Sequence, residues 1–595
     1  MLTRSSPAAP AGPERPHRFV WVVLAAAAIA LPMLLAFNLP PSSTFLNQAA
    51  ALIGWGALLV VLAASLNGRT LPHGSGLVAL LAALLLLLLA AFVSPLWTAL
   101  PWSLALSALA MIAAAMIAVL AGAVLQHEGL ALPAFRALCI GMVVAGALSS
   151  VVGMVQVFAP EWPDGDWIAR SGMAGRAVGN LRQPNHLATL LLWSAVAVVP
   201  LVEMGPLGRT RTRRAAALGL MALMVLGVTL SGSRTGLVGI AVLALWGLAD
   251  RRLSRFSRGL LLATPLLCAA SWGLTAGWAA LNDAHAIGVA ARVGEGDLSA
   301  SRFAIWRDTI ELIRMQPWLG VGFGEFNFAW SLTPLPNRPV AFFDHTHNLP
   351  LQLAVELGLP LAAVVLGLLA LALWQAWRRT WAFEGETGAG LRAAFVMVLL
   401  MALHSQLEYP LWYAHFLLPT ALIWGLCLGA GAASAQSEPI GRGARWPVVA
   451  GLAMVIAAVV VVVDYHRVVV IFSPPTGAAP LEERIAAGQR SWFFAKHADY
   501  AAATTADRPA DAMVAFKRAP HHLLDTRLMV AWAQALAQNG DVDRARHIAA
   551  RLREFRNPNS DEFFAPCTDA ALAPRPFQCE PPTRRYDWRD FTDAP

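Results

Sequence analysis

The sequence predicts an all-α, polytopic integral membrane protein of about thirteen transmembrane helices, and three observations support this fold class. The 595 residues are 57% hydrophobic and only 13% charged, whereas soluble domains carry about a quarter charged residues. Apolar runs such as 76–97 and 446–463 hold roughly twenty uncharged residues, enough to cross about 30 Å of hydrocarbon. These runs must be helical, because lipid offers no partner for backbone N–H and C=O groups.

The expected spans follow one another with short connections except at two places. In chain order they are approximately 18–37, 45–66, 76–95, 101–125, 135–158, 187–204, 214–230, 235–249, 259–280, 350–374, 390–408, 412–433 and 446–464. The first follows a Pro-rich, Arg-containing start, as a signal peptide would. Further spans come at once, so we expect an uncleaved first helix.

The arginine residues indicate the orientation of these spans. With residues 1–17 as a cytoplasmic tail, the clusters at 209–214, 251–258 and 378–379 all fall on the cytoplasmic side, as the positive-inside rule requires. An odd number of spans then places the tail 465–595 outside, together with the long loops 159–186 and 281–349. The net charge of +8 lies largely in these short connections, so we expect no nucleic-acid partner.

The outside tail contains a predicted helix pair and two cysteines. Asp525 and Asp541 are suited to cap helices over 526–538 and 542–555, a pair that looks like one tetratricopeptide-type repeat. The pair is either a small helical domain packed on the membrane part or a docking surface for a protein. Cys567 and Cys579 lie where an oxidising compartment permits a disulfide; the alternative is two unrelated thiols.

A dense polar segment ends the second long loop. It contains Asp344, His345 and His347, and Pro350 follows at the first turn of the next span. The positive end of that helix favours a neutral His347 ring, which suits a general base that accepts a proton from an alcohol. Asp344 is a candidate to orient the ring. The alternatives are a structural or substrate-binding histidine, or a metal site formed by Asp344, His345 and His347.

Three outside arginines depart from the charge pattern. Arg182, Arg234 and Arg302 are all expected near the membrane surface, where guanidinium groups can bind the diphosphate of a lipid-linked donor. The alternative is that each pairs with a local carboxylate or a lipid headgroup. The Gly-rich turn at 317–324 is a place where backbone could closely approach a ligand.

Two further segments contribute candidate site residues on the same side. The segment 182–186 supplies Gln183, Asn185 and His186 directly before a span. The corner 404–413 between two late spans supplies Glu408 and Tyr409. Trp412 and Tyr413 in that corner are more typical of interfacial anchors.

At these residues the chain resembles the O-antigen ligase and protein O-oligosaccharyltransferase family, which includes the WaaL ligases and has a GT-C-like fold. The family's signature, a His followed by Asn, Ser or Gln, nine residues and Gly, reads here His347-Asn348 and Gly358. The turn before Arg234 and the Arg302 segment resemble the family's two outside arginines. Segment 182–186, corner 404–413 and the long tail resemble the PglL or PilO branch, which glycosylates pilin and other exported proteins.

The resemblance implies a reaction and its partners. A preassembled oligosaccharide would move with inversion from undecaprenyl diphosphate to a hydroxyl of a pilin-like acceptor protein, without metal or other cofactor. The enzyme would lie in the bacterial inner membrane, with its active site in the periplasm. A ligase to lipid A core or an O-antigen polymerase would share His347 and the arginines.

Two readings of another class also fit a polytopic chain. A lipid-glycan transporter usually has ionisable groups or broken helices near the bilayer midplane, whereas Glu356, His404 and Glu408 are all expected toward the outer ends of their spans. The second reading is a non-enzymatic assembly scaffold that is organised by the helical tail.

Overall fold

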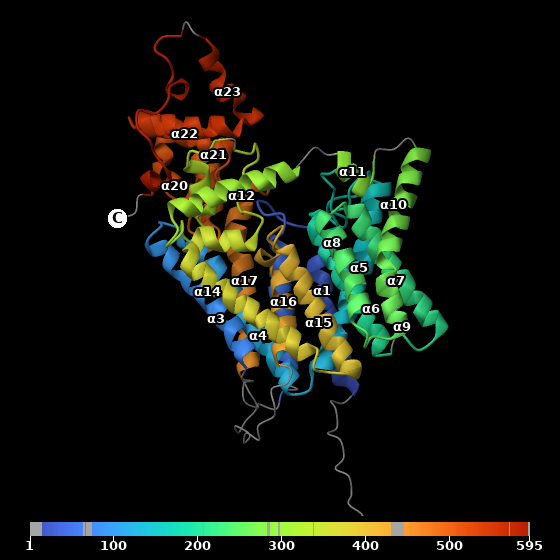
Figure 1. Ribbon diagram of the computed structural model, residues 1–595. Coiled ribbons are helices and arrows are strands. Elements are labelled where there is room, and N and C mark those ends of the chain that lie inside the picture. Colours follow the sequence, from blue (N-terminus) through green and yellow to red (C-terminus); the bar gives the residue numbers. More distant parts are fainter. Residues whose placement is uncertain are drawn as a thin grey trace, which may run out of the picture.

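The computed structural model describes residues 15–63, 66, 74–205, 207–282, 286–294, 298–336, 338–429, 445–569 and 572–592. Among these residues there are helices and no strands, as the sequence predicts. Of the expected cytoplasmic tail 1–17, residues 1–14 lie outside the described part of the chain. Figure 1 shows a bundle of long helices with a smaller helical group above one side of it.

The long helices form the membrane part. They are α1 (Arg15–Leu34), α2 (Phe45–Ala63), α3 (Ser75–Val93), α4 (Trp102–His127), α5 (Ala131–Phe158), α6 (Pro184–Glu203), α7 (Arg211–Ser231), α8 (Arg234–Ala249), α9 (Arg255–Leu262), α10 (Thr264–Leu281), α14 (Leu349–Thr380), α15 (Gly385–His404), α16 (Ala414–Gly429) and α17 (Trp446–Phe472). Within the described ranges, ten segments are long and apolar enough to cross a membrane, the consecutive helices α9 and α10 forming one of them. Three shorter apolar helices, Val20–Leu34, Arg234–Ala249 and Ala414–Gly429, coincide with the other expected spans. The chain is therefore a polytopic integral membrane protein.

The expected cytoplasmic arginine cluster 251–258 and the second long loop lie at opposite ends of the bundle. Figure 1 places α9, with the Arg251–Arg258 cluster, at the lower end of the bundle. The short helices α11 (Val289–Gly294), α12 (Leu298–Met315) and α13 (Phe326–Leu332) belong to the second long loop, and α11 and α12 lie at the upper end. The second long loop therefore lies at the end of the bundle opposite α9.

Close helix contacts in the bundle depend on small residues. Helices α4 and α16 pack together where a Cβ on Gly122 would lie 2.0 Å from the Leu422 carbonyl oxygen. In the same contact, a Cβ on Gly425 would lie 2.1 Å from the Val119 carbonyl oxygen. Small residues let backbones approach in membranes, where helix association depends on van der Waals contact.

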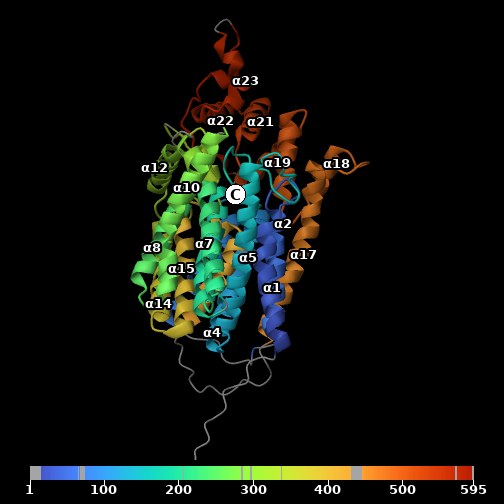
Figure 2. The same ribbon diagram turned by 90° about the vertical axis from the view of Figure 1, so that its right-hand side faces the viewer.

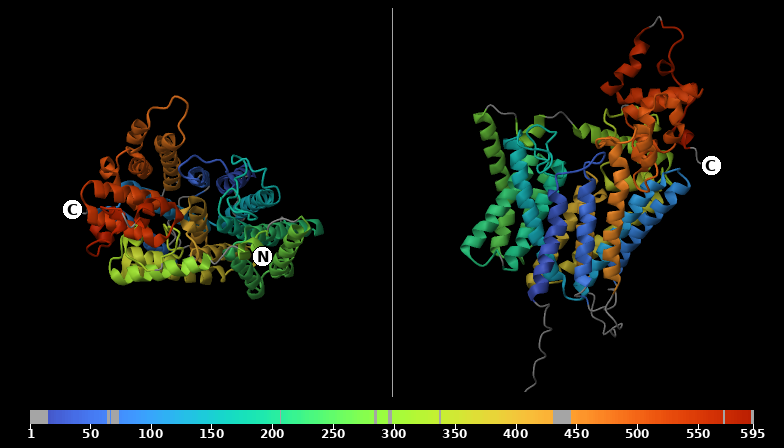
Figure 3. Two further views of the ribbon diagram at one scale, coloured as in Figure 1. Left: turned by 90° about the horizontal axis from the view of Figure 1, so that it is seen from above. Right: turned by 180° about the vertical axis from the view of Figure 1, so that it is seen from behind.

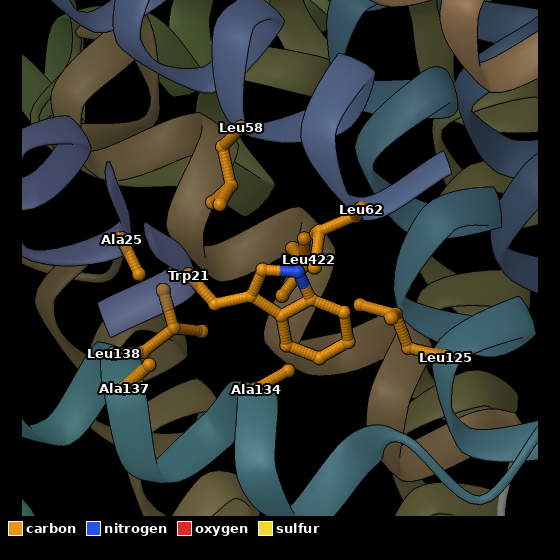
Figure 4. Close-up of a pocket in the computed structure, with 9 residues that line it drawn as sticks. All are labelled: Trp21, Ala25, Leu58, Leu62, Leu125, Ala134, Ala137, Leu138 and Leu422. Atoms are coloured by element: carbon orange, nitrogen blue, oxygen red, sulfur yellow. The ribbon is translucent and has the colours of Figure 1, made fainter. Parts of the chain in front are cut away.

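Packing elsewhere in this region leaves little space. A cavity of about 10 Å³ lies among these helices. Figure 4 shows its lining, which includes Trp21, Leu58 and Leu125. A space of this size holds at most about one water, and its lining side chains are almost entirely apolar. It is a packing gap between helices.

The C-terminal helices form the smaller group. They are α18 (Leu481–Gly488), α19 (Ala495–Thr505), α20 (Met513–Phe516), α21 (Thr526–Gln538), α22 (Val542–Phe555) and α23 (Asp561–Phe564). The α21 and α22 helices have the predicted bounds, and the side chains of Asp525 and Asp541 cap them as expected. In Figure 2, α21, α22 and α23 rise above the bundle, while α18 lies beside the upper end of α17. Seen from above in Figure 3, the C-terminal helices cover one side of the bundle. Cys567 and Cys579 are joined by a disulfide.

The C-terminal helices contact the second long loop through buried polar side chains. His521 Nδ1 lies 2.8 Å from both carboxylate oxygens of Glu325 at the start of α13, and its ring stacks on Phe328. Further along, Arg338 pairs with Glu554, and the His547 ring meets the Leu332 carbonyl oxygen over 2.8 Å. The loop that leads to His347 therefore rests on the C-terminal helices.

The contact between α4 and α16 predicts a specific loss of stability. We expect Gly425→Leu to lower the thermal unfolding temperature in detergent, because the new side chain meets backbone that cannot move aside; over-packing typically costs about 1–3 kcal/mol. Gly367→Leu on α14 is the matched control, since a Cβ there meets nothing within 4 Å. Equal unfolding temperatures for the two variants would contradict the proposed packing.

Candidate active site

His347 is held directly before the N-terminus of α14. Asn348 caps the helix by accepting from the Leu351 N–H over 3.0 Å, and Pro350 occupies the first turn. The loop contacts the corner 404–413, because Leu349 N–H donates to the Ser405 carbonyl oxygen over 2.8 Å. His347 itself has a φ of 55°, a conformation that non-glycine residues rarely adopt and that clusters at functional sites.

The carboxylate of Glu408 joins three segments of the chain. His347 Nδ1 lies 2.7 Å from Glu408 Oε2, and Asn185 Nδ2 donates to Oε1 over 2.8 Å. Arg302 of α12 also donates to Oε1. Burial would raise the pKa of Glu408, but the hydrogen bond from His347 and the charges of His347 and Arg302 outweigh it and hold that pKa below its usual range. Glu408 is therefore an anion surrounded by donors.

The hydrogen bond to Glu408 fixes the chemistry of the His347 ring. In the neutral ring, a bond from Nδ1 to a carboxylate places the proton on Nδ1 and leaves the lone pair on Nε2 as the acceptor. The ring is only partly exposed, at 15%, and is flanked by the rings of Phe343 and Tyr409. A base oriented by a carboxylate on its far nitrogen is the arrangement that activates hydroxyl nucleophiles.

The carboxylate that contacts His347 Nδ1 and orients its ring is Glu408, not Asp344 as predicted. Asp344 Oδ1 instead lies 3.2 Å from His345 Nδ1, and the His345 ring stacks on Tyr409 with 4.2 Å between ring centres. Spacing in sequence favoured Asp344, but the fold brings Glu408 from 61 positions further along the chain. Within the described residues, no three Asp, Glu, His or Cys side chains are grouped as a metal site would require.

Segment 182–186 connects this site to the start of α8. Gln183 caps α6 by accepting from the His186 N–H over 2.7 Å, which fixes Asn185 in the first turn. Asn185 then accepts from Ser233 Oγ over 2.6 Å while it donates to Glu408. His186 is buried beside Tyr413 and Phe416. Ser233 was not singled out by sequence reasoning, although its position as the N-cap of α8 is a recognisable signal.

The three predicted arginines have different surroundings. Arg302 contacts Glu408, at the centre of the site. Arg234 is the first residue of α8, next to Ser233, and its side chain is exposed. Arg182 donates to the carbonyl oxygens of Ala36 and Ser43 in the α1–α2 connection. Arg302 and Arg234 therefore border the site, whereas the guanidinium of Arg182 is directed toward backbone.

The Gly-rich turn at 317–324, expected to allow a close backbone approach to a ligand, makes a close backbone approach to α14. Val321 N–H and Gly322 N–H donate to the carbonyl oxygens of Val355 and Glu356, over 2.8 and 3.0 Å. At this point α14 is broken by Gly358, with a φ of 75°, and a Cβ there would lie 2.2 Å from the Trp318 carbonyl oxygen. The glycines let the turn pair with this opened helix backbone.

Comparison with known proteins gives several partial matches. Residues 219–366 match the family model described as O-Antigen ligase, and residues 177–201 match Protein glycosylation ligase. Residues 392–564 match Virulence factor membrane-bound polymerase, C-terminal. The chain is 27% identical over 260 residues to the General O-oligosaccharyltransferase of Acinetobacter baylyi (strain ATCC 33305 / BD413 / ADP1). That match covers 42% of this chain and 43% of the relative's length.

The position of Glu408 generates a prediction about the His347 loop. We expect Glu408→Ala to speed hydrogen exchange in segment 343–352, because it removes the anion that holds His347, Asn185 and Arg302 together; losing one partner of a buried pair typically costs about 3–5 kcal/mol. Glu311→Ala is the control, since it also removes a partner of an α12 arginine but at an exposed position. Unchanged exchange in the Glu408 variant would mean that the loop is held without this carboxylate.

Proposed function

We propose that this chain, which belongs to the O-antigen ligase and protein glycosylation ligase family, is a protein O-oligosaccharyltransferase. It transfers a preassembled glycan from undecaprenyl diphosphate to Ser or Thr hydroxyls of an exported, pilin-like protein. The observation that carries the proposal is the contact of His347 Nδ1 with Glu408, which leaves Nε2 available as a base.

The chemistry follows from that geometry. The acceptor hydroxyl gives its proton to His347 Nε2 while its oxygen forms a bond to the anomeric carbon of the glycan. The bond from that carbon to the diphosphate oxygen breaks, and undecaprenyl diphosphate leaves with both electrons. Attack from the face opposite the leaving group inverts the configuration. Glu408 stabilises the imidazolium that forms, as the carboxylate does in related dyads.

The donor is assigned to the side of the site that carries Arg234 and Arg302. The diphosphate of a membrane-anchored donor lies near the bilayer surface, and guanidinium groups stabilise the negative charge that develops on it as it leaves. Arg234 is exposed at the start of α8, where the helix dipole adds to its positive charge. Arg182 remains a third predicted donor-binding residue.

The charges and the disulfide support an assignment of the compartment that each end of the bundle faces. We place the arginine-rich end of the bundle in the cytoplasm and the face with His347 in the periplasm of a bacterial inner membrane. An oxidising compartment on that side agrees with the Cys567–Cys579 disulfide. The proposed reaction uses no metal or other cofactor.

A second candidate keeps the reaction and changes the acceptor. The match of residues 219–366 to the O-antigen ligase model favours transfer to lipid A core. The match of residues 392–564 to the polymerase model favours an O-antigen polymerase. The relative from Acinetobacter baylyi and the protein glycosylation ligase match favour a protein acceptor.

Reconstitution with two acceptors tests the proposal. The purified chain in liposomes, supplied with undecaprenyl-diphosphate oligosaccharide, is expected to glycosylate a pilin-like protein and not lipid A core. His347→Ala should reduce transfer by at least about 100-fold, since positioned general bases contribute roughly that much. His345→Ala, two positions away, is the matched control.

Two results would contradict this prediction. Glycosylation of lipid A core alone would assign the chain to the second candidate. Full transfer by a correctly inserted His347→Ala variant would remove the proposed base.

The donor assignment is tested by Arg234→Ala. We expect the KM for the lipid-linked donor to rise by about tenfold or more and the KM for the acceptor to stay unchanged, because a lost hydrogen bond to a charged group costs about 1.5–3 kcal/mol. Arg314→Ala, on the exposed face of α12, is the control. A rise in the acceptor KM instead would place Arg234 on the other side of the site.

A further inference from the structure

A groove of about 780 Å³ lies among the C-terminal helices, and Phe342 of the segment that leads to His347 contributes to its lining. Its amide side chains come from α21, from the turn after α22 and from the segment beside the disulfide: Gln534, Asn557, Asn559 and Gln578. Phe342 and Phe563 contribute aromatic surface. The proposed transfer reaction does not itself use this groove.

We propose that the groove binds an extended segment of the acceptor protein next to the Ser or Thr that is glycosylated. This inference rests on the proposed function and names the surface that selects its acceptor. Three features of the groove support a polypeptide as its occupant.

The first feature is the direct connection between the groove and the candidate base. Phe342 lines the groove and stacks on Phe555 of α22, with ring centres 3.9 Å apart. The adjacent Phe343 packs edge-on against the His347 ring at 5.4 Å. The consecutive residues Phe342 and Phe343 therefore contact the groove and the candidate base respectively, which places the groove next to the segment that carries His347.

The second feature is the chemistry of the lining. An amide side chain has both a donor and an acceptor, which match the N–H and C=O groups of an extended peptide. Asn557 Oδ1 already accepts from the Asn559 N–H and Gln578 Nε2 donates to the Phe563 carbonyl oxygen, so the amide nitrogen of Asn557 and the amide oxygen of Gln578 are the groups assigned to this role. The charged side chains are Asp525, Glu562 and Arg527, two carboxylates against one guanidinium, which does not favour a diphosphate. Apolar surface between the amides provides places for acceptor side chains.

The third feature is the position of the groove relative to the donor arginine. Figures 1 and 3 show α21–α23 above one side of the bundle, with α8 and α10 toward the other side. A lipid-anchored donor that reaches Arg234 therefore approaches His347 from the side away from the groove. An acceptor with a soluble domain can reach the raised C-terminal helices, whereas a lipid-anchored acceptor is held at the membrane.

The disulfide keeps one wall of this groove in place. Pro566 and Gln578 both line it, and each is adjacent to a cysteine of the Cys567–Cys579 bridge. The bridge holds the two segments together although few buried side chains lie near them.

Site-specific photocrosslinking in the full-length chain tests the occupant. A benzophenone amino acid at position 559, an exposed residue that lines the groove, is expected to form an adduct with the pilin-like protein. The same group at position 514, an exposed valine on α20 outside the groove, is expected to form none. An adduct with the donor glycan, or no adduct while transfer proceeds, would overturn the inference.

Kinetics provide the second measurement. Gln534→Trp, which fills the groove, should raise the KM for the pilin-like protein about tenfold and leave the donor KM and the kcat at saturating acceptor unchanged. Gln534→Ala should have a smaller effect, and Val514→Trp none. An unchanged acceptor KM for Gln534→Trp would overturn the inference while transfer by the wild-type chain still upheld the proposed function.

Discussion

The carboxylate of Glu408 is the interaction on which the candidate site depends. It binds His347 and Arg302, both from the second long loop, and Asn185 from the start of α6. Further hydrogen bonds surround it, from Trp306 Nε1 to the Thr346 carbonyl oxygen and from Asn348 Nδ2 to the Gln406 carbonyl oxygen. Burying an anion costs free energy unless hydrogen-bond donors surround it. The loss of one donor would therefore weaken the remaining contacts as well. The same group that orients the ring therefore holds together the surface around it.

The loop that carries His347 is supported from two further directions. Below it, the Gly-rich turn pairs with the opened backbone of α14 at Gly358. Beside it, the C-terminal helices hold Glu325 and Arg338 through His521 and Glu554. A strained His347 backbone persists only where the surroundings determine it strongly, and these contacts provide that support.

Much of this organisation could be predicted from sequence because it depends on local rules. Apolar runs located the spans, the Asp525 and Asp541 caps located α21 and α22, and Pro350 located the start of α14 within a residue. Partnerships across the chain could not be predicted in this way. Because Asp344 is close to His347 in sequence, it was the expected orienting carboxylate, and the glycines of 317–324 suggested an approach to a ligand. The fold shows that Glu408 contacts His347 and that the Gly-rich turn contacts the α14 backbone.

The attachment of the C-terminal helices also has a consequence for biosynthesis. His521, His547 and Glu554 are made long after Glu325, Leu332 and Arg338, the groups that they bind. While the chain is still being synthesised, the loop has emerged but its support has not. The loop that leads to His347 therefore gains these contacts only after the last helices have been synthesised and have folded back onto it.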